Sequence, residues 1–164
     1  MNNKPQKIET LKRKSRRKHL MNELSYMTFP ENAFLDIEEN KLFCQKVFTF
    51  LQSREDKIQI HGNHYREYIE KSEQTLNEMV KKLKVSPKKG RLLFFQDHEI
   101  EAVLVNVDEV FSHLNHLLEQ TKFSNGYGDF ILVSEDFHFG LCIERTEYHY
   151  EFSTWGFEFR NKEL

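Results

Sequence analysis

Residues 130–152 read FILVSEDFHFGLCIERTEYHYEF, and this stretch decides the fold class. Apolar and polar side chains alternate through much of it, and aromatic and β-branched residues are frequent. Both features are typical of β-strands that have one buried face. We therefore predict strands at 130–133, 137–143 and 148–152, which form an antiparallel sheet in the C-terminal part of the chain.

The turn between the last two strands determines which side chains share a face of the sheet. If Arg145 and Thr146 form a two-residue turn, Glu144 lies opposite Glu147, and all later pairs follow from that register. The apolar face then carries the pairs Ile143 with Tyr148, Leu141 with Tyr150, and Phe139 with Phe152. The polar face carries Glu144, Glu147 and Glu151, with Cys142 opposite His149, and is expected to be solvated. Like charges directly opposite each other are mildly destabilising, and a cationic partner would relieve them.

Upstream of the sheet, apolar side chains recur at three- and four-residue spacing. This period predicts helices at 7–24, 43–51, 65–83 and 107–118, with strands at 91–95 and 100–105 between the last two helices. The expected fold class is α+β, with a helical N-terminal half followed by a mainly antiparallel sheet that has one helix packed on it. We expect residues 1–25 to form a basic helical arm and residues 26–164 to form a single α+β domain.

Charge is segregated along the chain. The first 20 residues hold eight basic side chains and one acidic side chain, whereas residues 92–159 hold 13 acidic and two basic ones. The net charge of the first segment is therefore +7, and that of the second is −11. Such segregation influences which partners associate and how fast they do so. A nucleic-acid partner for the basic run 12–18 is one alternative. The other is a basic helix that is docked on the chain's own acidic sheet or is simply solvated.

Motifs for catalysis or metal binding are weak. The pairs His61 with His64 and His113 with His116 have metal-ligand spacing, but neither has a defined third ligand. Cys142 and His149 could form a thiolate–imidazole pair in the predicted hairpin, yet the sequence offers no oxyanion site beside them. We expect no catalytic residue, no metal and no cofactor, so the chain is expected not to be an enzyme.

The composition also indicates where the chain resides. No apolar stretch is long enough for a membrane span, and the basic N-terminus is not followed by the apolar segment of a signal peptide. Cys44 and Cys142 show no spacing typical of a disulfide or zinc site, so reduced thiols are expected. We expect a cytoplasmic protein with no membrane contact.

The stretch Gly126-Tyr-Gly-Asp-Phe-Ile-Leu-Val-Ser-Glu-Asp136, the stretch Phe139-Gly-Leu-Cys-Ile-Glu144 and the pair Trp155-Gly156 resemble the sheet region of bacterial immunity proteins. These proteins neutralise polymorphic toxins, and the likeness is to the SUKH-type group and to small immunity proteins encoded beside wall-associated toxins. The resemblance implies an antitoxin that binds the C-terminal nuclease domain of a cognate toxin through an acidic surface. By position, the interface candidates are Tyr127, Asp129, Glu135, Asp136, Glu144, Glu147, Glu151 and Trp155.

Overall fold

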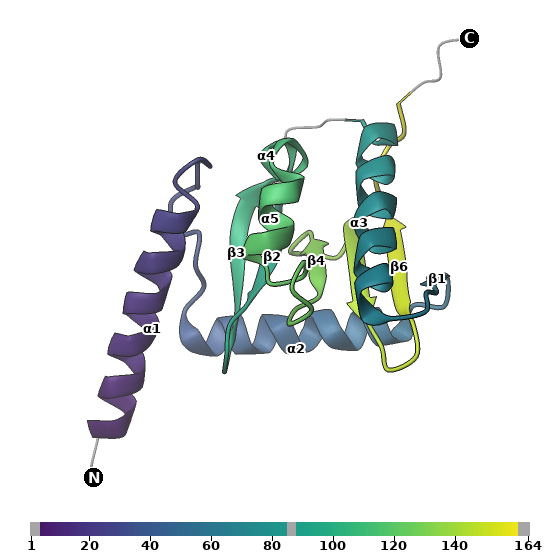
Figure 1. The fold of residues 1–164 in the computed structure, drawn as a ribbon. Coiled ribbons are helices and arrows are strands. Elements are labelled where there is room, and N and C mark those ends of the chain that lie inside the picture. The colour runs from purple at the N-terminus through teal and green to yellow at the C-terminus, as the bar shows by residue number, and fades with distance from the viewer. Residues whose placement is uncertain (1–3, 85–87, 161–164) are drawn as a thin grey trace.

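The computed structural model describes residues 4–84 and 88–160, which fold into a six-stranded antiparallel sheet covered by helices (Figure 1). The helices are α1 (Lys4–Glu23), α2 (Ile37–Ser53), α3 (Tyr65–Lys82), α4 (Val107–Ser112) and α5 (Leu114–Gln120). The strands are β1 (Ile58–Ile60), β2 (Lys89–Phe95), β3 (Ile100–Asn106), β4 (Phe130–Val133), β5 (Gly140–Arg145) and β6 (Tyr150–Trp155). Their order in the sheet is β1-β6-β5-β4-β2-β3. The predicted α+β class is confirmed, although more helices cover the sheet than the one expected.

The two faces of the sheet are both buried, each under different helices. On one face, side chains such as Leu92, Phe130 and Phe152 pack with residues of α3, α4 and α5. On the other face, Leu93, Ile131, Val133 and Cys142 pack with Cys44, Val47 and Leu51 of α2. Adjacent residues of a strand point to opposite faces, so a strand buried on both faces consists of consecutive apolar residues. The predicted polar face of β5 and β6 is therefore buried at Cys142 and Ser153, and the expectation of a solvated face is wrong there. Toward the β5–β6 loop, Glu144 and Glu151 are half-buried and Glu147 is exposed.

The register of the last hairpin also differs from the predicted one. Arg145 pairs with Tyr150, Glu144 with Glu151 and Ile143 with Phe152, so residues 146–149 form a four-residue loop. The shift moves the partners along the strand by an even number of residues, so the strand residues keep their predicted faces. Tyr148, however, leaves the core and lies exposed in the loop. Within the loop, the Thr146 amide donates to the His149 carbonyl oxygen at 2.9 Å, which closes the turn.

Backbone groups on the outer edge of β3 form hydrogen bonds with residues outside the sheet. The buried side chain of Asn40, on α2, donates to the Ile100 carbonyl oxygen at 2.7 Å and accepts from the Ala102 amide at 2.9 Å. The Leu104 amide donates to the Ala33 carbonyl oxygen at 2.9 Å. These bonds satisfy backbone groups that an edge strand otherwise leaves open to another strand.

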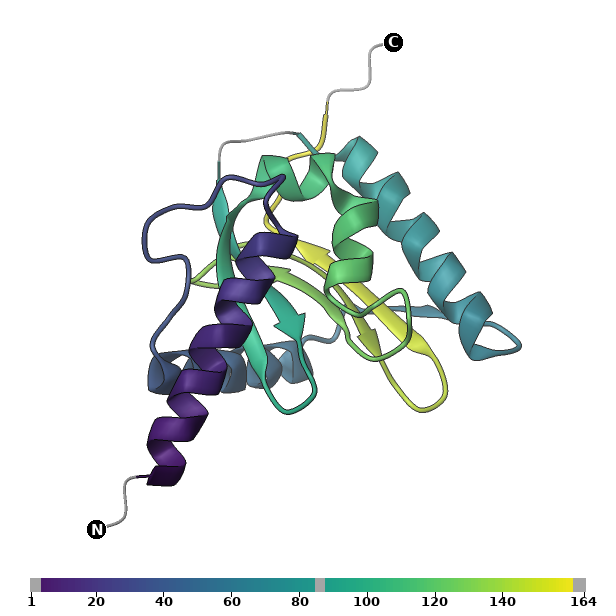
Figure 2. The same ribbon diagram turned by 60° about the vertical axis from the view of Figure 1, so that its left-hand side comes forward.

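Helix α1 lies along the β3 side of the sheet (Figure 2). Its last turn contributes Leu20 to the core, and Leu24 follows directly after the helix. Farther toward the N-terminus, Arg13 and Arg17 place their Nε atoms 2.9 Å from one carboxylate oxygen of Glu101, whose side chain is fully buried. The predicted alternative in which the basic helix docks on the acidic sheet is therefore observed for these arginines.

Candidate interaction surface

The eight candidate interface residues lie at two ends of the sheet and do not form one surface. Because β4 and β6 run upward in Figure 1 and β5 runs downward, Glu135, Asp136 and Trp155 lie at the upper end. Tyr127, Asp129, Glu144, Glu147 and Glu151 lie toward the lower end, near the β5–β6 loop. The predicted set therefore has to be divided before any part of it can act as an interface.

Glu144 and Glu151 are paired with a cation from the same chain. The Nζ atom of Lys57, just before β1, lies 2.8 Å from Glu144 Oε2 and 3.7 Å from Glu151 Oε2. Burial raises the pKa of Glu144, which Asp129 and Glu151 raise further, and the hydrogen bond and charge of Lys57 oppose this rise. The like charges are opposite each other, as the altered register requires, but Lys57 supplies the cation that we had expected from a partner.

Most of the other acidic candidates also have a cation or an imidazole beside them. Asp129 accepts from the Arg145 amide at 3.0 Å, and burial raises its pKa despite this bond. Glu135 Oε2 lies 3.6 Å from Arg91 Nη2, and Asp136 Oδ2 lies 2.9 Å from His138 Nδ1. The candidate Trp155 also has a cation beside it, because the Arg54 Cζ atom lies 4.0 Å from the centroid of the Trp155 ring. Much of the acidic charge in the C-terminal segment is therefore balanced within the fold.

Glu147 differs from these residues, because in residues 4–84 and 88–160 it makes no ion pair. It lies in the β5–β6 loop beside Tyr148, whose side chain is 76% exposed. Tyr127, in the turn before β4, is 77% exposed, and Tyr65, the first residue of α3, is 63% exposed. We call these four residues, Tyr65, Tyr127, Glu147 and Tyr148, the tyrosine end.

The loops of the tyrosine end are fixed by hydrogen bonds. The Arg145 guanidinium donates to the Gly126 carbonyl oxygen and so joins the β5–β6 loop to the turn before β4. The Tyr68 hydroxyl donates to the Tyr148 carbonyl oxygen at 3.1 Å and ties the same loop to α3. Gly126 has φ of +80°, a conformation that glycine adopts without strain. Hydrogen bonds therefore fix the backbone of the two loops that carry Tyr127 and Tyr148.

The start of α3 is defined by local capping. The His64 side chain accepts from the Glu67 amide at 3.4 Å, and the Glu67 carboxylate accepts from the Asn63 amide at 3.1 Å. This reciprocal arrangement satisfies two backbone donors at the helix end.

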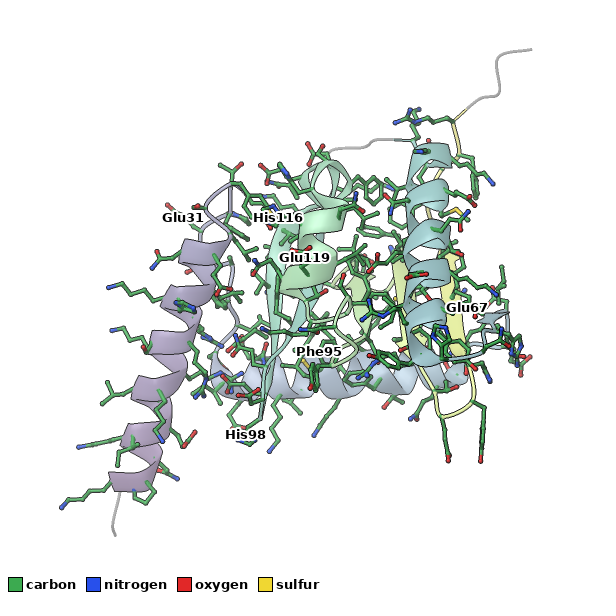
Figure 3. The ribbon with its side chains drawn as sticks, viewed as in Figure 1. Glu31, Glu67, Phe95, His98, His116 and Glu119 are labelled. Atoms are coloured by element: carbon green, nitrogen blue, oxygen red, sulfur yellow. The ribbon has the colours of Figure 1, made fainter. Side chains whose placement is uncertain are left out.

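Figure 3 places Glu67 on the lower part of α3 and places Phe95 and His98 toward the lower end of the β2–β3 hairpin.

The predicted pairing of Cys142 with His149 does not form. Cys142 lies opposite Ser153 and is fully buried against α2, whereas His149 lies in the loop, where its Nε2 is 3.4 Å from Glu151 Oε1. Burial raises the pKa of Cys142 far above its ordinary value, and burial raises that of Cys44 to about 11. A thiolate nucleophile requires the opposite environment.

The thiols of the native protein should therefore be unreactive near neutral pH. We expect the two cysteines to react with a chromogenic disulfide reagent only after unfolding, because both are buried and protonated. The time course of thiolate release, with and without denaturant, measures this. Rapid reaction of the native protein would contradict the buried placement of both side chains.

The histidine pairs do not gather metal ligands in the part of the chain that the structure describes, where no group of three or more His, Cys, Asp or Glu side chains could hold a metal ion. His113 and His116 instead enclose the Tyr26 ring, with centroid distances of 4.9 and 4.5 Å. His61 lies 5.5 Å, ring centroid to centroid, from His149.

Among the described residues, no helix is long and apolar enough to cross a membrane.

Sequence reasoning missed three residues of this region. Tyr148 was placed in the core because the two-residue turn put it opposite Ile143. Tyr65 was assigned only to a helical stripe, although it is exposed at the first turn. Lys57 precedes a three-residue strand, β1, which has too little pattern to be predicted from the sequence. The alternating Ile-Gln-Ile segment that follows Lys57 is the feature of the sequence that indicates a strand beside it.

Comparison with known proteins relates this chain to one family. A family model described as "YxiF protein" matches residues 20–155, which is most of the chain. A curated relative from Bacillus subtilis (strain 168), "Uncharacterized protein YxiF", is 42% identical over 67 residues. The match covers 39% of this chain and 43% of that relative, so the chain spans less than half the length of the relative that it matches. No solved structure matches the chain significantly.

Proposed function

The chain belongs to the YxiF protein family, and from this premise we propose that it is an immunity protein that binds and neutralises a cognate secreted toxin. The partner would be the C-terminal domain of that toxin, with a nuclease as the expected activity, and binding would take place in the cytoplasm without catalysis. The resemblance of residues 125–156 to immunity proteins supports this proposal. The tyrosine end is the surface that we assign to the toxin.

The observation that carries the assignment is the exposure of Tyr127 and Tyr148 on loops that hydrogen bonds hold in place. Tyrosine is enriched at the energetic centres of protein interfaces, because its ring buries a large area at a small cost in side-chain entropy. Exposed aromatic side chains on a fixed backbone lose less freedom on binding than those on a mobile loop. The tyrosine end therefore fits protein recognition.

The charge of Glu147 fits a basic partner. Nuclease domains bind phosphate backbones with lysine and arginine, and a carboxylate at the rim of an interface accelerates association with such a surface. The other acidic candidates at this end, Asp129, Glu144 and Glu151, lie next to Arg145 or Lys57. In this proposal they hold the loops and β1 in place, and Glu147 is the acidic residue that meets the toxin.

The test is protection of cells from the toxin domain encoded beside the gene of this chain. Co-expression of the chain should restore growth, and the purified pair should co-elute as a complex. Glu147→Lys should slow association several-fold, because it places a like charge before a basic partner. Glu38→Lys, a reversal at another exposed carboxylate, on α2, is the matched control and should keep full protection. Absence of both protection and complex formation in the unaltered chain would refute the proposal.

The alternative is a nucleic-acid-associated or regulatory protein that uses the basic N-terminal arm. The engagement of Arg13, Arg16 and Arg17 with Glu99 and Glu101 makes this less favourable, since arginine provides the strongest phosphate contacts. A gel-shift assay across a salt series, with the run 12–18 neutralised, distinguishes the two proposals.

A further inference from the structure

The arginines and lysines of α1 lie on different sides of the helix. Arg13, Arg16 and Arg17 face the β2–β3 hairpin, and their Nε atoms lie 2.6–2.9 Å from oxygens of Glu99 and Glu101. At about 100° per residue, the remaining basic side chains project away from the hairpin. Four of these, Lys7, Lys12, Lys14 and Lys18, are exposed and make no ion pair in residues 4–84 and 88–160.

Two aliphatic side chains lie in the middle of the lysines. Ile8 is 51% exposed and Leu11 is 66% exposed, although large aliphatic residues on an ordinary surface helix face the core. By helical spacing, Lys7, Lys14 and Lys18 flank them on one side and Lys12 on the other. We call these six residues, Lys7, Ile8, Leu11, Lys12, Lys14 and Lys18, the lysine face.

Within residues 4–84 and 88–160, the lysine face makes no ion pair. The buried residue of α1 is Leu20 in its last turn, and Arg13, Arg16 and Arg17, on the side away from the lysine face, pair with Glu99 and Glu101. Figures 1 and 2 show that the N-terminal part of α1 extends past the sheet, so its outer side is accessible along its length. From Lys7 to Lys18 this side is about 16 Å long. The match to the family begins only at residue 20, after the lysine face.

We propose that the lysine face docks reversibly on the surface of an anionic lipid bilayer. An apolar strip flanked by lysines is the pattern of helices that lie in the membrane interface, where the aliphatic groups enter the acyl boundary and the ammonium groups contact anionic headgroups. Each lysine near such a surface raises binding about fivefold, so four lysines supply most of the attraction. With only two aliphatic residues, the attachment would be weak and dependent on lipid composition.

Nucleic acid explains the same face less well. A phosphate backbone would attract the lysines, but it offers no apolar phase for Ile8 and Leu11. Among the described residues, α1 contains no Phe, Tyr or Trp for base stacking, and its one imidazole, His19, lies 2.9 Å from a Glu23 carboxylate oxygen. Its arginine forks are already occupied by Glu99 and Glu101. The sequence-based expectation of no membrane contact considered only a spanning segment, which an interfacial helix does not need. This inference is independent of toxin binding.

Co-sedimentation of the full chain with lipid vesicles tests the proposal. One set of vesicles is pure phosphatidylcholine, and in the other about a third of the lipid is phosphatidylglycerol. We expect binding to the anionic vesicles alone, and its loss in high salt. Lys7→Gln with Lys14→Gln should lower the partition coefficient about 25-fold. Ile8→Ser with Leu11→Ser should lower it about tenfold or more without a change in net charge.

The matched control is Lys81→Gln with Lys82→Gln, two exposed lysines in the last turn of α3. This pair removes the same charge and should leave vesicle binding within about twofold, since a local face and not net charge is responsible. The side chains replaced in these three double variants are all exposed, so the circular dichroism spectra of the variants should match that of the unaltered chain. Equal binding to both kinds of vesicle, or an equal loss in the control, overturns the proposal. Binding of RNA that survives Ile8→Ser with Leu11→Ser, without vesicle binding, also overturns it and assigns the face to nucleic acid.

Discussion

Replacement of both Tyr127 and Tyr148 by alanine is expected to weaken binding of the toxin domain about a hundredfold or more. Truncation of a tyrosine at the centre of an interface typically costs about 2 kcal/mol or more, and the two effects need not add. Both side chains are more than three-quarters exposed, so their removal should not change the free energy of unfolding by more than about 0.5 kcal/mol. The dissociation constant, measured by calorimetry, and the denaturation midpoint give the two quantities.

Leu42→Ala on α2 is the matched control for this pair, because Leu42 is a 55% exposed hydrophobic residue outside the tyrosine end. It should bind the toxin as well as the unaltered chain. If Leu42→Ala weakens binding and the tyrosine pair does not, the toxin binds elsewhere and only the assignment of the surface fails. If the unaltered chain does not bind, the proposed function itself fails.

Glu101→Ala is expected to have the largest effect on stability, about 3 kcal/mol or more. The side chain of Glu101 is fully buried, and its carboxylate accepts from both Arg13 and Arg17. Without Glu101, Arg17 loses the carboxylate beside its Nε atom, while Arg13 keeps Glu99. Loss of one partner of a buried ion pair is strongly destabilising, because the charge that remains is poorly compensated. For a chain of this length the expected decrease in Tm is about 6–12 °C, measured by calorimetry or circular dichroism.

Two further variants separate the loss of the pair from a general effect of truncation. Lys71→Ala breaks an exposed pair with Glu67 and should cost less than about 0.5 kcal/mol. Replacement of Glu101, Arg13 and Arg17 together by leucine and methionines should recover most of the stability, because it removes the buried charges at similar volume. A Glu101→Ala variant as stable as the unaltered chain would show that α1 is not held through this carboxylate.

The sequence was sufficient to predict the regular elements with strong periodicity. The stripe from Tyr65 to Leu83 became α3, and 130–133 became β4 with the predicted bounds. The helix predicted at 107–118 is divided at His113. This residue has φ of −117° and ψ of 25°, which are not helical, so α4 ends there and α5 begins after it. Apolar spacing continues across that break, so periodicity alone could not reveal it.

The candidate site was harder to predict, because it depended on the register of a single turn and on contacts between distant residues. Arg145-Thr146 lacks the residues that specify a two-residue turn, and the four-residue loop moved Tyr148 out of the core. Similarly, the acidic C-terminal segment suggested a free surface, but Arg13, Lys57 and Arg91 from earlier in the chain balance much of it. Charge counted along a sequence does not reveal which charges meet in space.

The pairing of Arg17 with Glu101 has a consequence for synthesis of the protein on the ribosome. The two residues are 84 positions apart, so at about 5–20 residues per second the arginine emerges roughly 4–17 seconds before its partner. During this interval the nascent α1 carries its arginines as well as its lysines in solution. The nascent chain is therefore strongly cationic until the β2–β3 hairpin is made, and only then can α1 dock.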